Sequence, residues 1–291
     1  MPFGTGSQVL FWEESLMKRT KFISGLALAA CGLLIATSAT AATTRYLVDF
    51  GRNDVATGGN QGAITPSPDV NGNYWNNFNK EAINPDTNSL DVPDNASFNG
   101  LVSVTNAPSA LGIQLVDSTG GNEWEANGAA NGGLLAPSAA LLGDFAIETA
   151  TRDYFFTTLS SASLVLNGLN PAGTYDLKFF GTRDTGSVRR TQYRATGGNG
   201  AMLSAILQTS GAGSGTAAHP NGNNDDTVSI LGLVPNGSNS INVDMLTIEG
   251  GFSYVGILQI TEKVVPEPAT GVLLALGAVF AVTGCSRRAR R

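Results

Sequence analysis

The feature that most constrains the fold of this chain is a series of short β-branched and aromatic stretches with turn residues between them. Alternating or continuous apolar stretches of this kind are typical of β-strands. Asn170-Pro171-Ala172-Gly173 and Pro235-Asn236-Gly237 are two of the turn signals that separate them. The expected strands are Arg45 to Phe50, Leu101 to Val104, Gly112 to Val116, Tyr154 to Thr158, Ser163 to Leu166, Thr174 to Thr182, Arg189 to Thr196, Met202 to Leu207, Thr227 to Leu231, Ser240 to Leu246 and Tyr254 to Thr261.

The glycine content favours strands and turns over helices. The chain has 36 glycines in 291 residues, and glycine is a poor helix former that turns use freely. Only Ser138 to Ala150 has a helical pattern, opened by Pro137-Ser138. Many strands, frequent turns and little helix predict an all-β fold, a two-sheet antiparallel β-sandwich of the jelly-roll type.

Two long polar stretches interrupt the expected strands, Gly51 to Asn99 and Gly211 to Asp226. Loops longer than about 15 residues inside a compact domain are typically functional or disordered. No internal repeat or second domain boundary divides the strands, so residues 43–263 are expected to form one β-sandwich domain.

Cysteine positions and charge exclude several kinds of site in this domain. Both cysteines, Cys31 and Cys285, lie outside it, so it has no disulfide, thiolate metal site or cysteine nucleophile. Residues 42–263 contain 10 Lys and Arg residues against 20 Asp and Glu residues, a net charge of −10. Binding to a phosphate backbone needs basic side chains, so nucleic acid is not an expected partner.

The N-terminal region has the pattern of a secretory signal helix over residues 17–41. Lys18, Arg19 and Lys21 precede an apolar stretch, and Ala39-Thr40-Ala41 gives a small-residue cleavage site for signal peptidase at Ala39 and Ala41. Residues 1–16 lack this pattern, which indicates an extension or a start at Met17. The alternative is a lipoprotein processing box ending at Cys31.

The C-terminal region, residues 264–291, has three parts in a fixed order. Val265-Pro266-Glu267-Pro268 precedes the apolar run from Ala269 to Cys285, and an arginine-rich tip follows. As a helix, that run spans roughly 26 Å, close to the thickness of a bilayer core. The terminal arginines would stay cytoplasmic, with the domain outside.

This tail resembles the PEP-CTERM sorting signal. The resemblance implies that a membrane protease, exosortase, cleaves near Val265, Pro266, Glu267 and Pro268 after transient anchoring in the inner membrane. It also implies delivery to the cell envelope or extracellular matrix, in organisms that produce exopolysaccharide. The alternative is a permanent transmembrane anchor.

Several segments of residues 45–260 resemble a galactose-binding-like, malectin-like jelly-roll domain. The resemblance implies a fold and, for many such domains, a glycan ligand, without a catalytic signature. The segments are Tyr46-Leu47-Val48-Asp49-Phe50-Gly51, Tyr74-Trp75-Asn76-Asn77-Phe78, Leu115-Val116-Asp117-Ser118, Ala150-Thr151-Arg152-Asp153-Tyr154-Phe155-Phe156 and the stretch from Gly168 to Arg183.

Tyr74, Trp75, Asn76 and Asn77 are candidate glycan-binding residues, because they combine aromatic rings with amides that donate and accept hydrogen bonds. Trp124, between two glutamates, is a second candidate platform. Polysaccharide is therefore the expected ligand. The alternative for both tryptophans is a place in the hydrophobic core.

Four arginines concentrate positive charge in one segment of an acidic domain. Guanidinium groups match carboxylates in a bidentate geometry, so an anionic sugar such as a uronate is one interpretation. A solvated hairpin with local salt bridges is the other. The residues are Arg183, Arg189, Arg190 and Arg194.

A cofactor is not expected, apart from a structural calcium ion. Oxygen-rich side chains for such an ion occur at Asn221, Asn223, Asn224, Asp225 and Asp226, although an ordinary Asx-rich turn explains them equally. A weaker set is Asp49 with Asn53 and Asp54.

The sequence shows no catalytic residues. The one histidine, His219, has no recognisable serine partner, and the carboxylates considered for glycoside hydrolysis have no diagnostic spacing. These carboxylates are Asp117, Glu123, Glu125 and Asp144. The expected function is a non-enzymatic, exported, carbohydrate-binding matrix protein. The alternatives are a structural or adhesive protein with a protein partner and, third, an exported hydrolase.

Overall fold

The computed structural model describes residues 42–86, 88–93, 95–116 and 123–264. Residues 42–264 form one compact unit. The expected signal helix, its cleavage site, the Pro-Glu-Pro motif and the C-terminal helix lie outside the described residues. Within them, none of the helices has the length and apolar character needed to cross a bilayer.

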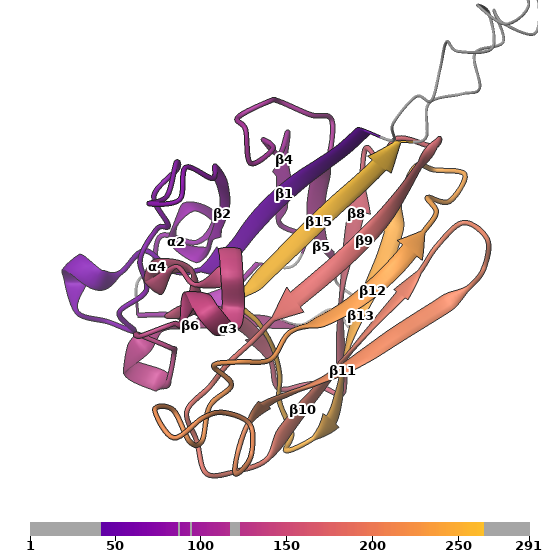
Figure 1. The fold of residues 1–291 in the computed structure, drawn as a ribbon. Helices are drawn as coiled ribbons and strands as arrows, with labels where there is room; N and C mark the ends of the chain where they lie inside the picture. Colours follow the sequence, from indigo (N-terminus) through magenta and orange to yellow (C-terminus); the bar gives the residue numbers. More distant parts are fainter. Residues whose placement is uncertain (1–41, 87, 94, 117–122, 265–291) are drawn as a thin grey trace, which may run out of the picture. The chain divides into compact units, whose positions relative to one another are not determined.

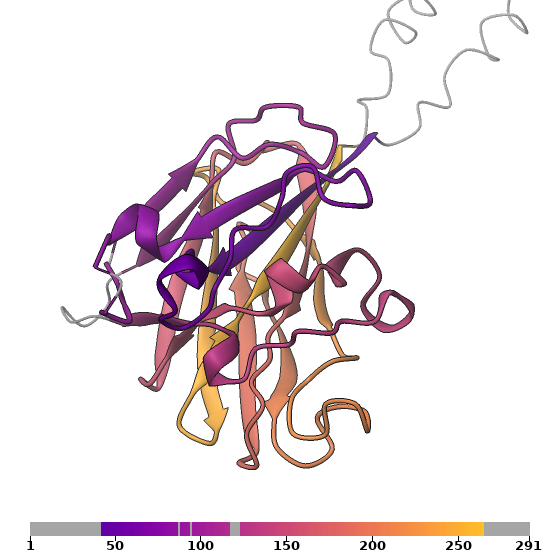
Figure 2. The ribbon, with the colours of Figure 1, turned by 90° about the vertical axis from the view of Figure 1, so that its left-hand side faces the viewer.

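The described chain is an all-β sandwich built from three sheets (Figures 1 and 2). A five-stranded sheet has the order β12 (Val228–Leu233), β9 (Gly173–Phe180), β15 (Ile257–Val264), β1 (Ala42–Gly51), β2 (Trp75–Asn79). A six-stranded sheet has the order β11 (Met202–Ser210), β10 (Arg189–Thr196), β13 (Ile241–Glu249), β8 (Ser161–Asn167), β5 (Gly112–Val116), β4 (Ser97–Asn99). A four-stranded sheet has the order β14 (Ser253–Val255), β7 (Tyr154–Thr157), β6 (Trp124–Asn127), β3 (Asp91–Val92).

Helices in the described residues are single turns. The pattern over Ser138 to Ala150 forms three separate turns rather than one helix, because Gly143 takes a positive φ of 59° between them. Figure 1 shows α3 and α4 lying over β1 and β15. The turns are η1 (Val55–Thr57), α2 (Lys80–Ile83), η2 (Ala129–Asn131), α3 (Ala139–Leu142), η3 (Gly143–Phe145) and α4 (Glu148–Thr151).

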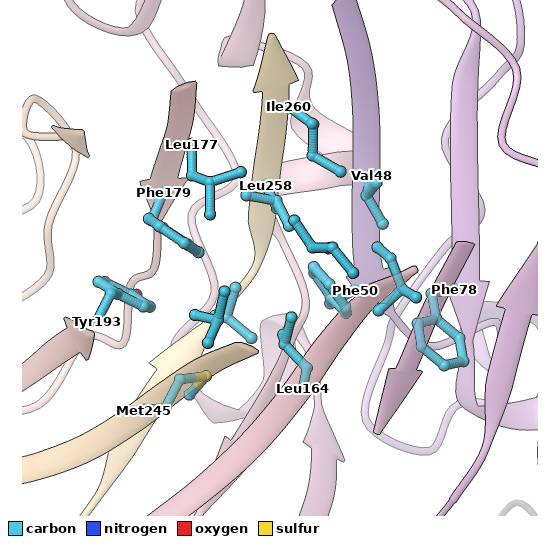
Figure 3. Packing of buried hydrophobic residues seen from close by; sticks show 14 of the residues in the cluster. Val48, Phe50, Phe78, Leu164, Leu177, Phe179, Tyr193, Met245, Leu258 and Ile260 are labelled. Atoms are coloured by element: carbon cyan, nitrogen blue, oxygen red, sulfur yellow. The ribbon is translucent and has the colours of Figure 1, made fainter. Parts of the chain in front are cut away.

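The main core lies between the two larger sheets. Strand β8 alternates buried and half-buried residues along its length, as expected for a strand with one face on a core. Facing residues interdigitate in Figure 3, where Phe179 of β9 stacks on Tyr193 of β10 with ring centroids 4.2 Å apart. This burial supplies most of the free energy that holds the sheets together.

Most expected strands are confirmed, but the sheet arrangement differs in two respects. A third sheet is present, and β1 pairs with β2 in parallel, so the sandwich is neither two-sheeted nor fully antiparallel. The stretch Tyr254 to Thr261 is divided between β14 and β15 at Gly256. Leu101 to Val104 forms only an isolated bridge, from Val102 to Pro108.

The polar stretch Gly51 to Asn99 is not the single long loop that the sequence indicates. It contains β2, β3, β4 and α2. Strand β2 was not predicted, because its asparagines are typical of loops. In the structure the amide of Asn76 is buried and bonds to the backbone of Leu47 and Val102 instead of facing solvent. The stretch Gly211 to Asp226 does lack strands, as expected.

Arg52 ties the end of β1 to two other parts of the sandwich. Its side chain is completely buried. Its Nε lies 3.1 Å from Asp54 Oδ2 and its Nη2 lies 2.9 Å from Glu81 Oε1. Its Nη1 donates to the carbonyl oxygens of Ser89 and Ala126, at 3.2 and 3.0 Å. One guanidinium therefore links β1 with α2, with the segment before β3 and with β6.

We expect Arg52→Met to lower the free energy of unfolding by about 3–5 kcal/mol, because Asp54 and Glu81 would lose a buried cation. Arg45→Met is the matched control. The Arg45–Asp144 pair is partly exposed, so its loss should cost less than about 1 kcal/mol. Urea unfolding at pH 7 measures both values, and equal losses would contradict this role of Arg52.

Candidate functional site

A pocket lies at the end of the sandwich where β9 ends and β15 begins. Phe180 pairs with Ile257 there, whereas Ala42 pairs with Val264 at the opposite end. Figure 1 shows the orange loop 211–226 at the end away from those terminal strand residues. Ligand sites of β-sandwiches are typically formed by loops at one end, because the strands hold the loops in place.

Close backbone contacts bring the walls of this pocket together. The Asp184 N–H donates to the Gly132 carbonyl at 2.7 Å. A Cβ at Gly133 would lie 1.8 Å from the Arg152 carbonyl oxygen, so only glycine allows this approach. The segment after β6 is thereby held against the segment after β9.

The loop Gly211 to Asp226 forms the third wall and is fixed by its own amides. Asn223 donates from Nδ2 to the carbonyls of Gly181 and Asp226, at 3.1 and 2.9 Å. Asn224 accepts from the Thr216 N–H at 2.9 Å and donates to the Thr216 hydroxyl at 2.8 Å. Both side chains are buried.

These contacts match an Asx-rich turn better than the predicted calcium site at Asn221, Asn223, Asn224, Asp225 and Asp226. The amide oxygens of Asn223 and Asn224 already accept backbone hydrogen bonds, and Asp225 and Asp226 are exposed. Among the described residues, no three His, Cys, Asp or Glu side chains gather closely enough to hold a metal ion.

The weaker set at Asp49, Asn53 and Asp54 is also engaged elsewhere. Asp54 pairs with Arg52 and accepts from the Asn60 and Gly62 N–H groups, at 2.6 and 2.8 Å. Asp49 accepts from the Thr65 hydroxyl at 2.7 Å. A cation shared by these residues would have to displace these bonds.

The pocket has a volume of about 350 Å³, within the range of small-ligand sites. Its lining combines apolar and polar residues. The apolar ones are Ala129, Gly132, Gly133, Leu134, Leu135, Ala136 and Ala218, and the polar ones are Asp184, His219 and Asn224.

His219 is placed to act as a neutral hydrogen-bonding group. Its Nδ1 lies 3.9 Å from Asp184 Oδ2, beyond hydrogen-bond distance. Its Nε2 is buried and has no hydrogen-bond partner among the residues that the structure describes. Burial lowers the pKa of His219, against the opposing charge of Asp184, so the imidazole is neutral at pH 7. A neutral imidazole both donates and accepts.

This site was not expected from the sequence. His219 looked like a surface residue of a polar loop, and Asp184, Leu134 and Leu135 were not singled out. The only local signal was Gly132-Gly133 followed by two leucines, a turn next to apolar residues that no strand pattern explains. The partners come from segments far apart in sequence.

A second hollow lies on the outer face of the five-stranded sheet, beside α3 and η3. Its volume is about 540 Å³, and its basic residues are already paired. Arg45 forms an ion pair with Asp144, and Lys178 Nζ lies 4.9 Å from the centre of the Phe145 ring. It therefore offers a ligand fewer unpaired polar side chains than the first pocket, which is called the loop-end pocket below.

The two tryptophans predicted as glycan platforms lie in the core. Trp75 is 3% exposed and Trp124 is 0% exposed, so neither ring presents a face to a ligand in this structure. Trp75 Nε1 donates to Asp69 Oδ2 at 2.8 Å, which allows the ring to be buried beneath α3 and η3.

The neighbours of Trp75 are also engaged. Asn76 bonds to the backbone of Leu47 and Val102, and Asn77 bonds to both backbone groups of Thr65. Tyr74 is half-buried. The segment Tyr74 to Asn77 thus joins β1 to β2 and has no free amides for a sugar.

Of the carboxylates considered for hydrolysis, Asp144 lies against a different sheet from the one that contains Glu125. Glu125 lies on β6, where burial and then the charge of Asp91 raise its pKa. Asp144 pairs with Arg45 on the outer face of the five-stranded sheet. Glu123 is buried before β6, and Asp117 lies outside the described residues.

A separate pair of carboxyl groups is buried beneath α4. Asp49 and Asp153 each have one buried oxygen, Oδ1, without a hydrogen-bond partner among the described residues. Burial raises the pKa of Asp49 to about 7. Burial also raises the pKa of Asp153, as does the charge of Asp49, although the Arg52 and Ala63 N–H groups oppose this rise.

This pair makes stability depend on pH. The native pKa of Asp49, about 7, lies above the unfolded value of about 3.9. The native state therefore keeps a proton that the unfolded state releases, so the stabilisation is complete below about pH 4 and is lost as pH rises through about 7. Asp49→Asn should flatten this dependence, which reaches about 1.4 kcal/mol per pH unit for one group.

Urea unfolding between pH 4 and 8 measures this effect. Glu249→Gln, which removes a carboxylate from an exposed ion pair, is the control and should keep the wild-type profile. An Asp49→Asn profile parallel to that of wild type would contradict the assignment.

No protein-family model and no curated protein matches this chain. Among solved structures, the chain is similar to TmCBM61 in complex with beta-1,4-galactotriose, at 14% identity and a TM-score of 0.24, over 53% of this chain and 85% of that one. It is also similar to an adhesin domain of Lys-gingipain from Porphyromonas gingivalis, at 8% identity and a TM-score of 0.28, over 52% and 89%. A third structure is the family 32 CBM from C. perfringens NanJ in complex with galactose, at 14% identity and a TM-score of 0.24, over 47% and 93%. At these TM-scores the likenesses assign neither a family nor a ligand to the chain.

Proposed function

We propose that residues 42–264 form a carbohydrate-binding domain that holds one sugar unit in the loop-end pocket. The observation that carries this proposal is the pocket itself, whose lining combines apolar residues with Asp184 and His219. Sugars present an apolar ring face and hydroxyl groups, and such ligands bind where apolar area and a few oriented polar groups meet.

The chemistry of the two polar residues suits hydroxyl groups. Asp184 is 42% exposed at its side chain and can accept a charge-assisted hydrogen bond. Because Nε2 of His219 is buried, neutral His219 would contact a second hydroxyl through Nδ1. Leu134 and Leu135 supply the apolar wall.

The same lining favours binding over hydrolysis. It contains one carboxylate, whereas glycoside hydrolysis ordinarily uses two on opposite sides of the scissile bond. It contains no serine, threonine or cysteine that His219 would activate. The proposed function is therefore non-enzymatic.

The proposal includes the route by which the protein reaches its ligand. We propose that the chain is exported through its signal peptide, sorted by exosortase through Val265 to Pro268, and released into the envelope or matrix. There, a jelly-roll domain of the galactose-binding-like or malectin-like kind would contact exopolysaccharide. The sequence patterns of residues 17–41 and 264–291 support this route.

Leu135→Glu should weaken binding at least 10-fold, because it puts a charge on the apolar wall of the pocket. Leu231→Glu is the matched control, since Leu231 is an equally exposed leucine on β12 and does not line the pocket. A glycan array with residues 42–264, followed by calorimetry on each hit, measures both. A hit that survives Leu135→Glu unchanged would place binding elsewhere, and a blank array would reject the proposed function.

Tail processing has its own test. In a host with exosortase, protein isolated from the envelope should end near Pro266-Glu267-Pro268 and lack Arg287 to Arg291 by mass spectrometry. Replacing these three residues with alanine should leave the tail attached, whereas Glu262→Ala should not. Recovery of the wild-type tail in membranes would support a permanent anchor instead.

A further inference from the structure

The structure divides the four clustered arginines into two kinds. Arg190 pairs with Glu249 at 3.0 Å, and Arg194 pairs with Asp244 at 2.7 Å, both on the outer side of the six-stranded sheet. These two arginines form the local salt bridges that the sequence led us to expect, with partners on β13. Arg183 and Arg189 form no ion pair with any carboxylate that the structure describes.

Arg189 lies against aromatic rings at the start of β10. It is 9% exposed, and its guanidinium carbon is 4.0 Å from the centre of the Phe252 ring and 5.6 Å from that of Tyr254. Its Nη1 donates to the Tyr254 hydroxyl. A Cβ at Gly250 would lie 2.6 Å from Arg189 Cγ, so the glycine lets the turn before Phe252 approach the arginine.

Arg183 lies next to Arg189, because both bond to Thr209: the Arg183 N–H donates to the Thr209 carbonyl at 3.0 Å, and the Thr209 hydroxyl donates to the Arg189 carbonyl at 3.4 Å. Burial lowers the pKa of Arg189, and the nearby charge of Arg183 lowers it further. Both guanidiniums also act on Tyr154, opposing the rise of its pKa to about 12 that burial causes. The Nε atoms of both arginines are buried and have no hydrogen-bond partner among the described residues.

Two like charges in a partly buried site are unfavourable unless an anion joins them. Burying a cation costs free energy that is recovered only through a paired charge and satisfied donors. Each guanidinium presents donors in a planar fork that matches a carboxylate. An anionic group beside Arg183 and Arg189 would offset the repulsion between the two guanidiniums.

The arginine pair is next to the proposed sugar pocket. Asp184, which lines the pocket, follows Arg183 directly in the chain. Tyr154, which lies beside both arginines, donates from its hydroxyl to the Asn131 carbonyl at 2.8 Å. Gly132, the next residue, lines the pocket and accepts from the Asp184 N–H. The segments around Gly132 and around Asp184 line the pocket, and their neighbouring residues lie beside the arginine pair.

We propose that Arg183 and Arg189 bind the carboxylate of an acidic sugar unit, so that the domain recognises a uronate-containing polysaccharide. This inference rests on the proposed function, because it names the class of glycan whose neighbouring unit occupies the pocket. The domain carries a net charge of −10 over residues 42–263. Recognition of an anion must therefore come from this local site and not from the overall field.

The test measures how tightly residues 42–264 bind two polymers, polygalacturonate and its methyl ester. This segment contains every strand of the three sheets and their core. Esterification removes the negative charge of the carboxyl group and keeps the sugar backbone. Polygalacturonate should bind at least 10-fold more tightly than the ester. Arg183→Gln should weaken polygalacturonate binding at least 10-fold and leave ester binding unchanged.

Two further variants make the test specific. Arg190→Gln removes the same charge from a salt-bridged arginine of the same region and should leave polygalacturonate binding within about 2-fold of wild type. Arg189→Lys keeps the charge but loses the planar fork, and should weaken polygalacturonate binding. Thermal unfolding of each variant verifies that it is folded.

Each outcome separates the inference from the function on which it rests. Equal losses in Arg183→Gln and Arg190→Gln would show a general charge effect and overturn the arginine site. Tight binding of both polymers, unaffected by Arg183→Gln, would keep the sugar pocket and overturn the arginine site. Preference for dextran sulfate over polygalacturonate would overturn the carboxylate as ligand. Binding to neither polymer nor any arrayed glycan would overturn both proposals.

Discussion

The arrangement of this domain depends on a completely buried arginine, Arg52, at the end of β1. A guanidinium without solvent is tolerated only if its charge and donors are satisfied, and Arg52 is held by Asp54, Glu81 and the carbonyls of Ser89 and Ala126. These contacts set the four-stranded sheet against the end of the five-stranded sheet. Strand β6, which contains Ala126, leads directly into the wall of the loop-end pocket.

From this fixed frame, the site is assembled by short contacts between distant segments. Gly133 lets the chain after β6 pass against Arg152, and the Gly132 carbonyl receives the Asp184 N–H. The neutral charge state of His219 at pH 7 follows from its burial in the third wall. The arginine pair beside this pocket has no carboxylate partner among the described residues, and this gives the acidic-glycan hypothesis its physical basis.

The sequence predicted the regular strands well and the site poorly. β5 and β10 match their expected bounds, because alternating residues with one face on a core have a clear pattern. Strand β2 was missed because buried asparagines look like loop residues until their backbone partners are known. The sequence left Trp75 open between a glycan platform and the core; its burial, with Nε1 bonded to Asp69, places it in the core. Arg189 and Arg190 point to opposite faces of β10, as strand alternation requires, but the sequence does not show that the face of Arg189 is covered by Phe252 and Tyr254. The signal peptide and the sorting tail stay predictions.

If the pocket and the arginine pair form one binding surface at the loop end of the sandwich, one ligand should affect both. Nuclear magnetic resonance of ¹⁵N-labelled residues 42–264, titrated with an acidic galacturonate oligosaccharide, measures this. We expect shifts of the Gly132, Gly133, Asp184 and His219 signals together with the Nε–H signals of Arg183 and Arg189. Shifts confined to Arg45, Lys178 and Gln259 on the outer face of the five-stranded sheet, or no shifts at all, would contradict a shared binding surface.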